Sequence, residues 1–453
     1  MTKDPYRRIF PLNLTAFERF MQTDDRAEYP MTFVIEMDFA GILKRPEFED
    51  AVRQTLERHP LFISRVEIGK RGIPVWILDR NLEPTISFGS KEDPIECPTG
   101  ETFDNDKEAG VRIYVRQGDE KVRVTFYFDH KATDGVAAHT FCGEVFAFYA
   151  NAVEGKEVAQ VLDLNPVLLK TRQKRQLFYG GITLKNERNW KAWISAIKLT
   201  GFSSQILASR HKRGDSQIIP RFGVLTRSLD AQEHKLLRDA AIQKGITVND
   251  IVITELILTM IAWNKRLNKL NGRKIKILMP SNLRRRGDDE MPNANMTTYN
   301  FITRKPKQCL DRFEMIKGIR DDTNNIKNNA TGAEFLEILA KGFTYSWLIP
   351  FLVSSRSTLC TSVISNVGDP TRRYTARIPR KKGDLICGNL TLEQVGGSPP
   401  LRPNTRSGWA ITTYRRKFTV SVRCDPYLYD EKDTSELLDI FFAGLRAWIS
   451  PEK

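Results

Sequence analysis

The chain has 453 residues, enough for two or more ordinary domains and for a hydrophobic core of enzyme size. Its 70 Lys and Arg against 55 Asp and Glu give a formal charge of +15, which attracts polyanions, although charges spread through the chain also fit an ordinary solvated surface. No apolar run is long enough to cross a bilayer, so a transmembrane segment is excluded.

Helical and strand-like segments alternate in the first part of the chain. A short helix is predicted at 12–21, a strand at 31–39 and an amphipathic helix at 45–57, where Pro46 favours the helix start. Further alternating segments predict strands at 64–68, 74–78 and 111–115. Residues 1–165 are therefore expected to form one α/β half.

A longer strand, 121–130, ends in the segment FDHKATDG. Its apolar residues share one parity with His130, so His130 should point into the covered side of the strand and Asp129 away from it. Helical spacing then predicts a buried helix, on the residues Ala137, Phe141, Val145 and Phe148. The histidine is expected where a strand passes into a helix inside the fold.

A basic and polar stretch separates this half from the next. Residues 166–221 are interpreted as a crossing segment with a helical middle, and 222–453 as a second α/β half. In that half we expect strands, helices and a hairpin, at 222–229, 231–244, 248–267 (capped by Thr247), 275–280, 409–423 and 435–448. Some chain from beyond residue 340 is expected to cover the first half.

The six cysteines form no CxxC pair and no metal-ligand spacing. The N-terminal residues carry charges and no apolar leader segment. A reduced, cytoplasmic protein without a metal is the expectation.

The HKATDG segment and three other stretches, taken together, resemble a known superfamily. HKATDG fits the pattern HxxxDG. The other stretches stand in the expected order: FPLNLTAFERFM with ERHPLFISRV before HKATDG, and ITVNDIVITELI and then MPSNLRRRG with ISNVGDP after it. They are similar to the thioester-dependent acyltransferases related to chloramphenicol acetyltransferase. These include peptide-synthetase condensation domains, wax ester synthases, plant acyltransferases and the acyltransferases of mycobacterial polyketide lipids.

The resemblance implies a pseudo-dimer of two α/β subdomains, each a mixed sheet with flanking helices, and an active-site tunnel between them. It also implies that Asp134 points away from the substrate and pairs with an arginine of the second half, for which Arg284 is the first choice and Arg286 the alternative. Two features depart from the family: Asp129 stands where many members have a second histidine, and the DFGWG loop of the plant enzymes is absent.

Independently of the resemblance, acyl transfer from a thioester requires a general base. A thioester is already activated, so the enzyme mainly removes a proton from the attacking alcohol or amine and stabilises the oxyanion. His130 is the candidate, because a neutral imidazole is the dominant form near pH 7. A buried, satisfied core histidine is the alternative.

The neighbouring residues have two interpretations each. Asp134 is either a simple helix cap or also the partner of Arg284. The Gly135 N–H is a candidate oxyanion donor, or else Gly135 only serves the turn. Ser365 or Asn366 is a candidate second donor, or else both belong to a structural loop. His59 is expected to end a helix, and His139 to lie in the core.

Three basic clusters are candidates for holding the phosphates of coenzyme A or an acidic carrier protein: 284–286, 372–373 and 380–382. Solvated surface is the alternative for the last two clusters, and no nucleic-acid-binding module is present. The expected activity is transfer of an acyl group from acyl-CoA, or an acyl carrier protein thioester, to a small-molecule alcohol, with no bound cofactor. There are two rivals: a free-standing condensation enzyme that forms an amide from a carrier-protein-bound acyl group, and a non-catalytic protein that binds a thioester or a carrier protein without turnover.

Overall fold

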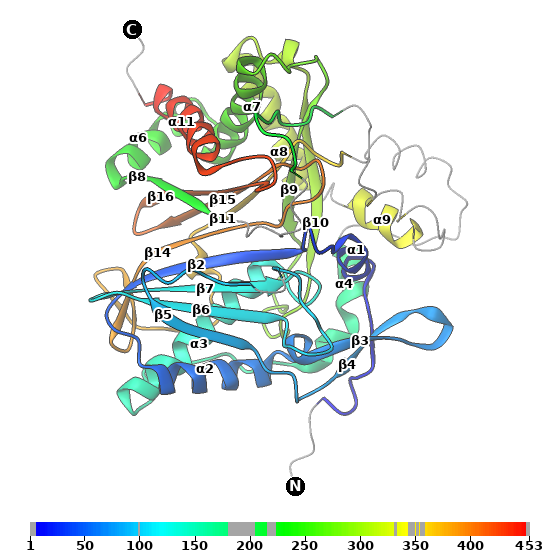
Figure 1. The fold of residues 1–453 in the computed structure, drawn as a ribbon, viewed down its shortest axis with the longest axis vertical. Coiled ribbons are helices and arrows are strands. Elements are labelled where there is room, and N and C mark those ends of the chain that lie inside the picture. Colours follow the sequence, from blue (N-terminus) through cyan, green and yellow to red (C-terminus); the bar gives the residue numbers. More distant parts are fainter. Residues whose placement is uncertain are drawn as a thin grey trace.

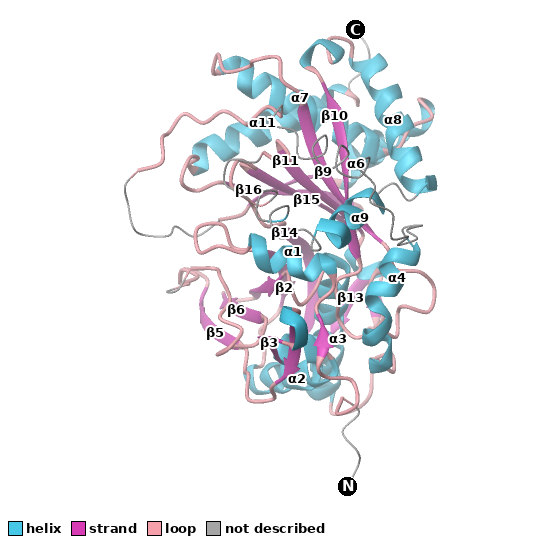
Figure 2. Ribbon diagram, turned by 90° about the vertical axis from the view of Figure 1, so that its right-hand side faces the viewer, coloured by secondary structure: helices cyan, strands magenta, loops and turns pink. Residues whose placement is uncertain are grey.

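The structure is a computed structural model and describes residues 6–97, 100–179, 204–214, 223–329, 333–342, 349, 353 and 358–449. Two β-sheets lie in the middle of the molecule and helices cover the outer face of each, which gives four layers (Figure 1). The view at right angles shows the same order, with helices at both ends of the molecule (Figure 2). This arrangement confirms the predicted mixed α/β class.

The first sheet has seven strands in the order β12-β13-β14-β2-β7-β6-β5. Only β5 and β6 are parallel. Its strands are β2 (Thr32–Ala40), β5 (Thr85–Ser90), β6 (Val111–Gln117), β7 (Lys121–Asp129), β12 (Arg380–Lys381), β13 (Asp384–Cys387) and β14 (Leu390–Ser398). Helices α2 (Arg45–Arg58) and α3 (Gly135–Glu154) pack beneath it and share its apolar core.

The second sheet has six strands in the order β10-β9-β11-β15-β16-β8. It is mixed, because β11 runs parallel to both β9 and β15. Its strands are β8 (Leu225–Leu229), β9 (Ile275–Asn282), β10 (Thr297–Arg304), β11 (Ser362–Gly368), β15 (Ser407–Tyr414) and β16 (Lys417–Cys424). The helices that cover it are α6 (Ala231–Gln243), α7 (Val248–Arg266), α8 (Arg312–Asn329) and α11 (Glu431–Ala447).

The remaining elements lie at one side of the two sheets. A three-stranded sheet combines β1 (Leu12–Asn13), β3 (Ser64–Ile68) and β4 (Pro74–Leu78). Helix α1 (Ala16–Asp24) packs its phenylalanines against α9 (Ala333–Gly342), and Arg172 of α4 (Arg172–Tyr179) donates to Glu18 of α1.

The chain crosses between the halves, as expected. Strands β12 to β14 come from beyond residue 340 but extend the first sheet, and β14 pairs antiparallel with β2 from Thr391↔Ala40 to Ser398↔Val34. Buried ion pairs cross the same boundary, since Arg402 meets Asp24 and Arg423 meets Glu101. The predicted boundary at residue 222 therefore does not separate the two sheets, because 380–398 belong to the first.

A twin glycine makes this crossing possible. Gly397 has a positive φ of 147°, and a Cβ there would lie 2.1 Å from the carbonyl oxygen of Val34. A Cβ on Gly396 would lie 2.8 Å from the Ser421 hydroxyl of the second sheet. Only glycine lets β14 approach both β2 and the neighbouring sheet this closely.

Several elements differ from the predictions. The first helix begins at Ala16 and not at residue 12, because Thr15 and Glu18 form a capping box that fixes its start. The last helix begins four residues earlier than predicted, where Asp430 caps it. Strands β5, β10, β11 and β14 and helices α8 and α9 were not predicted, and most of the predicted helix of the crossing segment lies outside the described residues.

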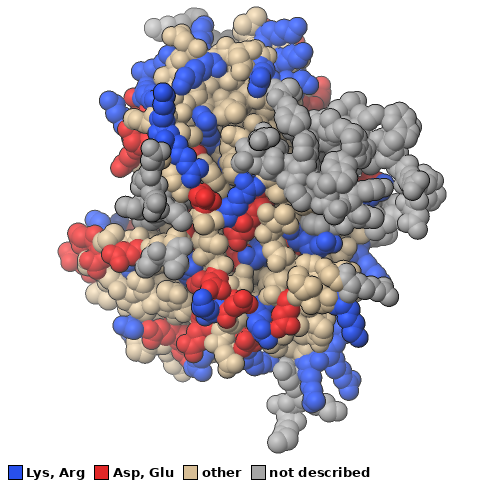
Figure 3. Space-filling model, turned by 45° about the vertical axis from the view of Figure 1, so that its right-hand side comes forward, with Lys and Arg blue, Asp and Glu red and all other residues tan. Residues whose placement is uncertain are grey.

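In the described ranges no single helix is both long and apolar enough to cross a membrane, and the pair α6 and α7, which passes the same test jointly, is bent by 101°. All six cysteines are free. Basic and acidic side chains are interspersed on the face shown in Figure 3, in agreement with the spread of charge along the chain.

Candidate active site

The HKATDG loop connects β7 to α3 and is fixed at both ends. The His130 N–H continues the pairing of β7 by donating to the Met31 carbonyl at 2.9 Å. At the other end the Asp134 carboxylate caps α3 by accepting from the Ala137 N–H at 3.0 Å. His130 is thereby held at a sharp turn between a strand and a buried helix.

One hydrogen bond of the His130 ring determines its tautomer. Nδ1 lies 2.9 Å from the Thr133 carbonyl oxygen. A carbonyl can only accept, so in the neutral ring Nδ1 carries the proton and Nε2 has the free lone pair. This is the tautomer that a general base requires.

The surroundings of His130 keep the ring neutral. It is 8% exposed, and the rings of Phe17 and Phe33 lie edge-on with centroids 6.2 and 5.0 Å away. Burial lowers its pKa, and the hydrogen bond to Thr133 and the charge of Asp134 only partly oppose this effect. Near neutral pH the imidazole is therefore unprotonated.

Asp134 has both of its proposed roles. Nη1 of Arg284 lies 2.9 and 2.8 Å from its two carboxylate oxygens, and the Met296 N–H donates to Oδ2 at 2.6 Å. The other Arg284 nitrogen, Nη2, donates to the Ala294 carbonyl at 2.7 Å. The carboxylate thus caps the helix and joins the HKATDG loop to the second half, while Arg286, the alternative partner, is solvent-exposed.

A residue absent from the sequence predictions also holds the loop. The Asn295 amide donates to the carbonyl oxygens of His130 and Lys131 at 2.7 and 2.8 Å, and its side chain is fully buried. No sequence signal identifies it, because 165 residues separate it from His130 and only the fold brings the two together.

Asp129 belongs to a buried cluster of charges. Lys131 Nζ lies 3.3 Å from Asp129 and 3.2 Å from Asp25, and Asn105 also donates to Asp129 at 2.8 Å. Burial disfavours the charged form of Lys131, but the attraction of the two aspartates is the stronger effect and raises the pKa of the ammonium. Asp129 does lie on the opposite face from His130, but that face is covered too and Asp129 is only 2% exposed. It is a structural residue in this chain.

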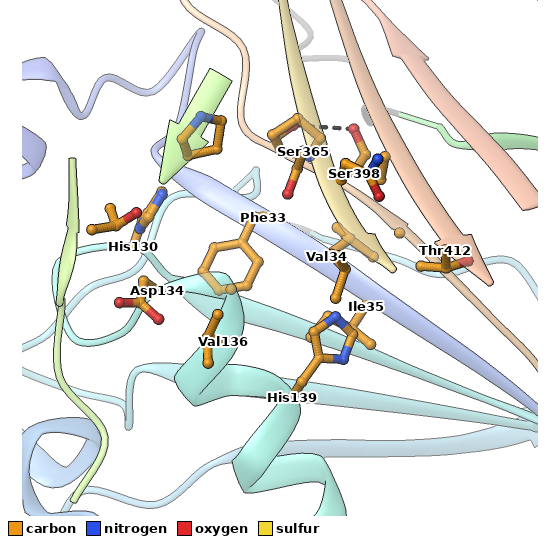
Figure 4. Close-up of a pocket in the computed structure, with 18 of the residues that line it drawn as sticks. Phe33, Val34, Ile35, His130, Asp134, Val136, His139, Ser365, Ser398 and Thr412 are labelled. Atoms are coloured by element: carbon orange, nitrogen blue, oxygen red, sulfur yellow. Dashed lines mark hydrogen bonds between the residues drawn. The ribbon is translucent and has the colours of Figure 1, made fainter. Parts of the chain in front are cut away.

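A cavity of about 190 Å³ opens in front of His130, between the two halves. The first half contributes the HKATDG loop, Phe33 to Ile35 of β2 and the start of α3. The second half contributes Ser365 of β11, Ser398 beyond the twin glycine and Thr412 of β15, which form the wall opposite α3 in Figure 4.

Gly135 lines this cavity at the first position of α3. It does not have a positive φ, and a Cβ at this position would meet nothing within 4 Å. Turn geometry therefore does not require a glycine here. Its absent side chain leaves space at the end of the helix, where backbone N–H groups lack an intrahelical partner.

The two candidate residues of β11 differ from each other. Both line the cavity. The Asn366 amide is engaged in the fold, since Nδ2 donates to Asn249 at 2.9 Å and Oδ1 accepts from the Gly368 N–H at 3.2 Å. Ser365 is the better candidate for contact with a ligand.

The other histidines of the first half have separate roles. His59 ends α2, accepts from the Asn293 N–H at 3.0 Å and lies 3.2 Å from Glu144, so it is structural as expected. His139 is 3% exposed but faces the cavity (Figure 4), and its Nδ1 has no hydrogen-bond partner among the residues that the structure describes. Burial and then Arg373 lower the pKa of His139 to about 4.

Two of the basic clusters meet at a second cavity of about 430 Å³, which we call the arginine pocket. It is lined by Arg284, Arg285, Arg286, Arg372 and Arg373, with Asp288, Asp289, Asn293, Tyr374 and Thr375 among its other residues. The third cluster, 380–382, does not line it, although Arg380 donates to Thr371 nearby at 2.7 Å.

Within the described part of the chain, one group of side chains has the spacing of metal ligands: His211, Asp430 and Asp433. None of them lines either cavity. Arg210 donates to Asp433 at 2.7 Å and already neutralises that carboxylate.

Comparisons with known proteins agree on the fold. No protein-family model and no curated sequence matches the chain. Among solved structures it is similar to the first condensation domain of the CDA synthetase, with a TM-score of 0.70 and 12% identity over 98% of this chain and 97% of that one. It is also similar to TRI3 trichothecene 15-O-acetyltransferase from Fusarium sporotrichioides, with a TM-score of 0.65 and 12% identity over 96% and 94%.

A third match is polyketide synthase associated protein 5 from Mycobacterium tuberculosis, with a TM-score of 0.62 and 14% identity over 97% of this chain and 98% of that one. All three cover nearly the whole of both chains. The chain therefore has the fold of condensation domains and of this acetyltransferase, as the sequence resemblance predicted.

Proposed function

We propose that the chain is an acyltransferase that moves an acyl group from a thioester to a hydroxyl group, with His130 as general base. The observation that carries the proposal is the His130 tautomer: Nδ1 donates to Thr133, and the ring lines a cavity between the two halves. The shared fold with condensation domains and an acetyltransferase supports acyl transfer in general.

In the proposed reaction the substrate hydroxyl loses its proton to Nε2 of His130 as its oxygen attacks the thioester carbonyl carbon. The tetrahedral intermediate then collapses, the carbon–sulfur bond breaks, and the imidazolium returns the proton to the thiolate. The ester and the free thiol leave, and the ring is again neutral.

The oxyanion of that intermediate needs donors on the side away from His130. The Gly135 N–H at the start of α3 is the first of these, because the positive end of a helix dipole favours a developing negative charge. The Ser365 hydroxyl on the opposite wall is the second. No covalent acyl-enzyme is required, since the thioester is already activated and the base acts directly on the acceptor.

We also propose the carrier of the acyl group and the acceptor of this reaction. Coenzyme A is the preferred carrier of the acyl group, with an acyl carrier protein as the alternative. An alcohol is the preferred acceptor, as in the acetyltransferase named above. With an amine acceptor the chain would be a condensation enzyme, and the similarity to condensation domains supports this alternative.

The test compares His130→Ala with His234→Ala. His234 is a matched control, because it is 6% exposed, its Nδ1 also bonds a carbonyl, that of Arg416 at 2.8 Å, and it does not line the cavity. Free-thiol release from acyl-CoA in the presence of an alcohol panel should fall by about two to four orders of magnitude in His130→Ala, with little loss of thermal stability. His234→Ala should keep its turnover per folded molecule.

The pH dependence gives an independent readout. Since the neutral ring is the active form and burial lowers the pKa of His130, the rate should rise with pH through a value below 6.5 and then level off. Near-wild-type turnover in well-folded His130→Ala protein would refute the assignment. Tight thioester binding without turnover in the wild type would favour a non-catalytic binding protein.

A further inference from the structure

The arginine pocket adjoins the cavity in front of His130. Val136, Asn282 and Arg373 line both spaces. A ligand in the larger space therefore lies next to the cavity of His130, with Arg373 at the boundary between the two.

The charge of this pocket comes from two distant parts of the sequence. Five arginines line it, against two aspartates. Arg284 is paired with Asp134, Arg372 lies 3.4 Å from Asp369, and Asp288 is paired with Arg175, so these charges are already balanced.

Two cations in the pocket are not balanced in this way. Among the described residues neither Arg286 nor Arg373 forms an ion pair, and both are solvent-exposed. Two guanidinium groups that share one hollow repel each other unless an anion lies between them.

The segment that carries Arg372 and Arg373 is packed firmly against α3. A Cβ on Gly143, in the middle of that helix, would lie 2.6 Å from Cγ of Tyr374, so the glycine is what lets the ring lie on the helix. The Thr140 hydroxyl also donates to the Arg373 carbonyl at 3.2 Å. The arginines are therefore positioned by the scaffold, close to the beginning of the catalytic helix.

We infer that the arginine pocket binds the phosphate groups of a coenzyme A thioester, whose pantetheine arm passes Arg373 toward His130. Phosphate oxygens only accept hydrogen bonds, which matches guanidinium donors. The pyrophosphate and 3′-phosphate of coenzyme A together match several arginines, whereas the single phosphodiester of a carrier-protein arm does not. This inference rests on the proposed function and names the side from which the donor enters.

The test is calorimetric titration of the full chain with coenzyme A, dephospho-coenzyme A and pantetheine. We expect Arg286→Gln combined with Arg373→Gln to weaken coenzyme A binding by about 10- to 100-fold, to weaken dephospho-coenzyme A binding less, and to leave pantetheine binding unchanged. Lys381→Gln combined with Lys382→Gln removes the same charge outside the pocket and should change nothing.

Equal effects of the two double variants, or coenzyme A binding no tighter than pantetheine binding in the wild type, would overturn the inference. Since titration requires no turnover, its result is separate from that of the His130 experiment. Coenzyme A binding in the pocket without transfer refutes only the function. Transfer from S-acetylpantetheine, with no contribution of the phosphates to binding, refutes only the pocket.

Discussion

At the scale of single residues, most polar side chains of the HKATDG loop have a partner within the fold. His130 donates to Thr133, Lys131 lies between two aspartates, and Asp134 caps a helix while it binds Arg284. Such a network fixes side-chain positions before any substrate binds, and in the proposed reaction this preorganisation would lower the barrier of the proton transfer. Only the face of His130 that carries Nε2 is left for chemistry.

A substitution at Gly135 separates an effect on substrate space from an effect on the stability of the fold. In Gly135→Ala the new methyl group meets no protein atom, and alanine is the better helix former, so the melting temperature should stay the same or rise. Because the methyl would occupy substrate space, kcat/KM should fall by about 10- to 100-fold.

Gly155→Ala is the matched control, because Gly155 ends the same helix with a positive φ of 63°. That variant should lose stability and keep its activity. Full activity of Gly135→Ala would mean that the reacting groups do not approach this end of α3.

His139 should make the protein sensitive to acid. Its pKa is about 4 in the folded chain and 6.5 in the reference state, so between these values the unfolded chain binds more protons. The stability is therefore complete above pH 6.5 and is lost as the pH falls toward 4, by up to about 3 kcal/mol.

His139→Leu removes this proton site and the unpartnered Nδ1. We expect its free energy of unfolding to equal or exceed that of the wild type at pH 8, and to decline less between pH 6.5 and 4. Denaturant titrations at several pH values measure the difference. Parallel stability curves for the two proteins would show that His139 is protonated in the folded state as well.

At the scale of elements, the Asp134–Arg284 pair connects β7 and α3 to β9 and β10. Both side chains are largely buried, at 4% and 12% exposed, so removing either partner strands the other charge and should cost about 3–5 kcal/mol. Asp134→Asn is the informative change, because asparagine still caps a helix but cannot form the ion pair.

The double variant Asp134→Asn with Arg284→Gln should lose less stability than the sum of the single variants, by about 0.5–3 kcal/mol. Chemical denaturation of the four proteins gives this coupling energy. Additive losses would leave Asp134 as a helix cap whose contact with Arg284 contributes nothing.

Local signals account for the elements that could be predicted. Thr247 capping α7 and the alternation along β7 are complete within a few residues, so both were predicted from sequence. The capping box of Thr15 and Glu18 was also readable and would have corrected the start of α1. Strand β14, in contrast, contains Glu393, Gln394 and two glycines, and it is a strand because β2 offers it a partner.

The same distinction applies to the candidate site. His130, Asp134 and Arg284 were chosen from a motif and a resemblance, and the fold brings the three together. Asn295, the cavity-facing orientation of His139 and the arginine pocket depend on contacts between segments that are far apart in the chain. Local patterns do not contain that information.

At the scale of the whole molecule, the two halves depend on each other. Strand β14 covers the edge of β2, and the buried Asp24 and Glu101 of the first half have their arginine partners, Arg402 and Arg423, in the second. Residues 1–165 alone would therefore expose an unpaired edge strand and lose both of these arginines.

We expect the 1–165 fragment to be aggregated or to lack a cooperative thermal transition, as measured by size-exclusion chromatography and circular dichroism. In the intact chain, Gly397→Ala tests the same dependence, because its Cβ would meet the Val34 carbonyl at 2.1 Å and separate β14 from β2. Gly383→Ala is the control, since Gly383 also has a positive φ, of 92°, but a Cβ there would meet no atom within 4 Å. Strain alone should cost both variants about 1 kcal/mol, so a much larger loss of stability in Gly397→Ala measures what the crossing strand contributes. A monomeric 1–165 fragment that unfolds cooperatively would show instead that the first half is complete without it.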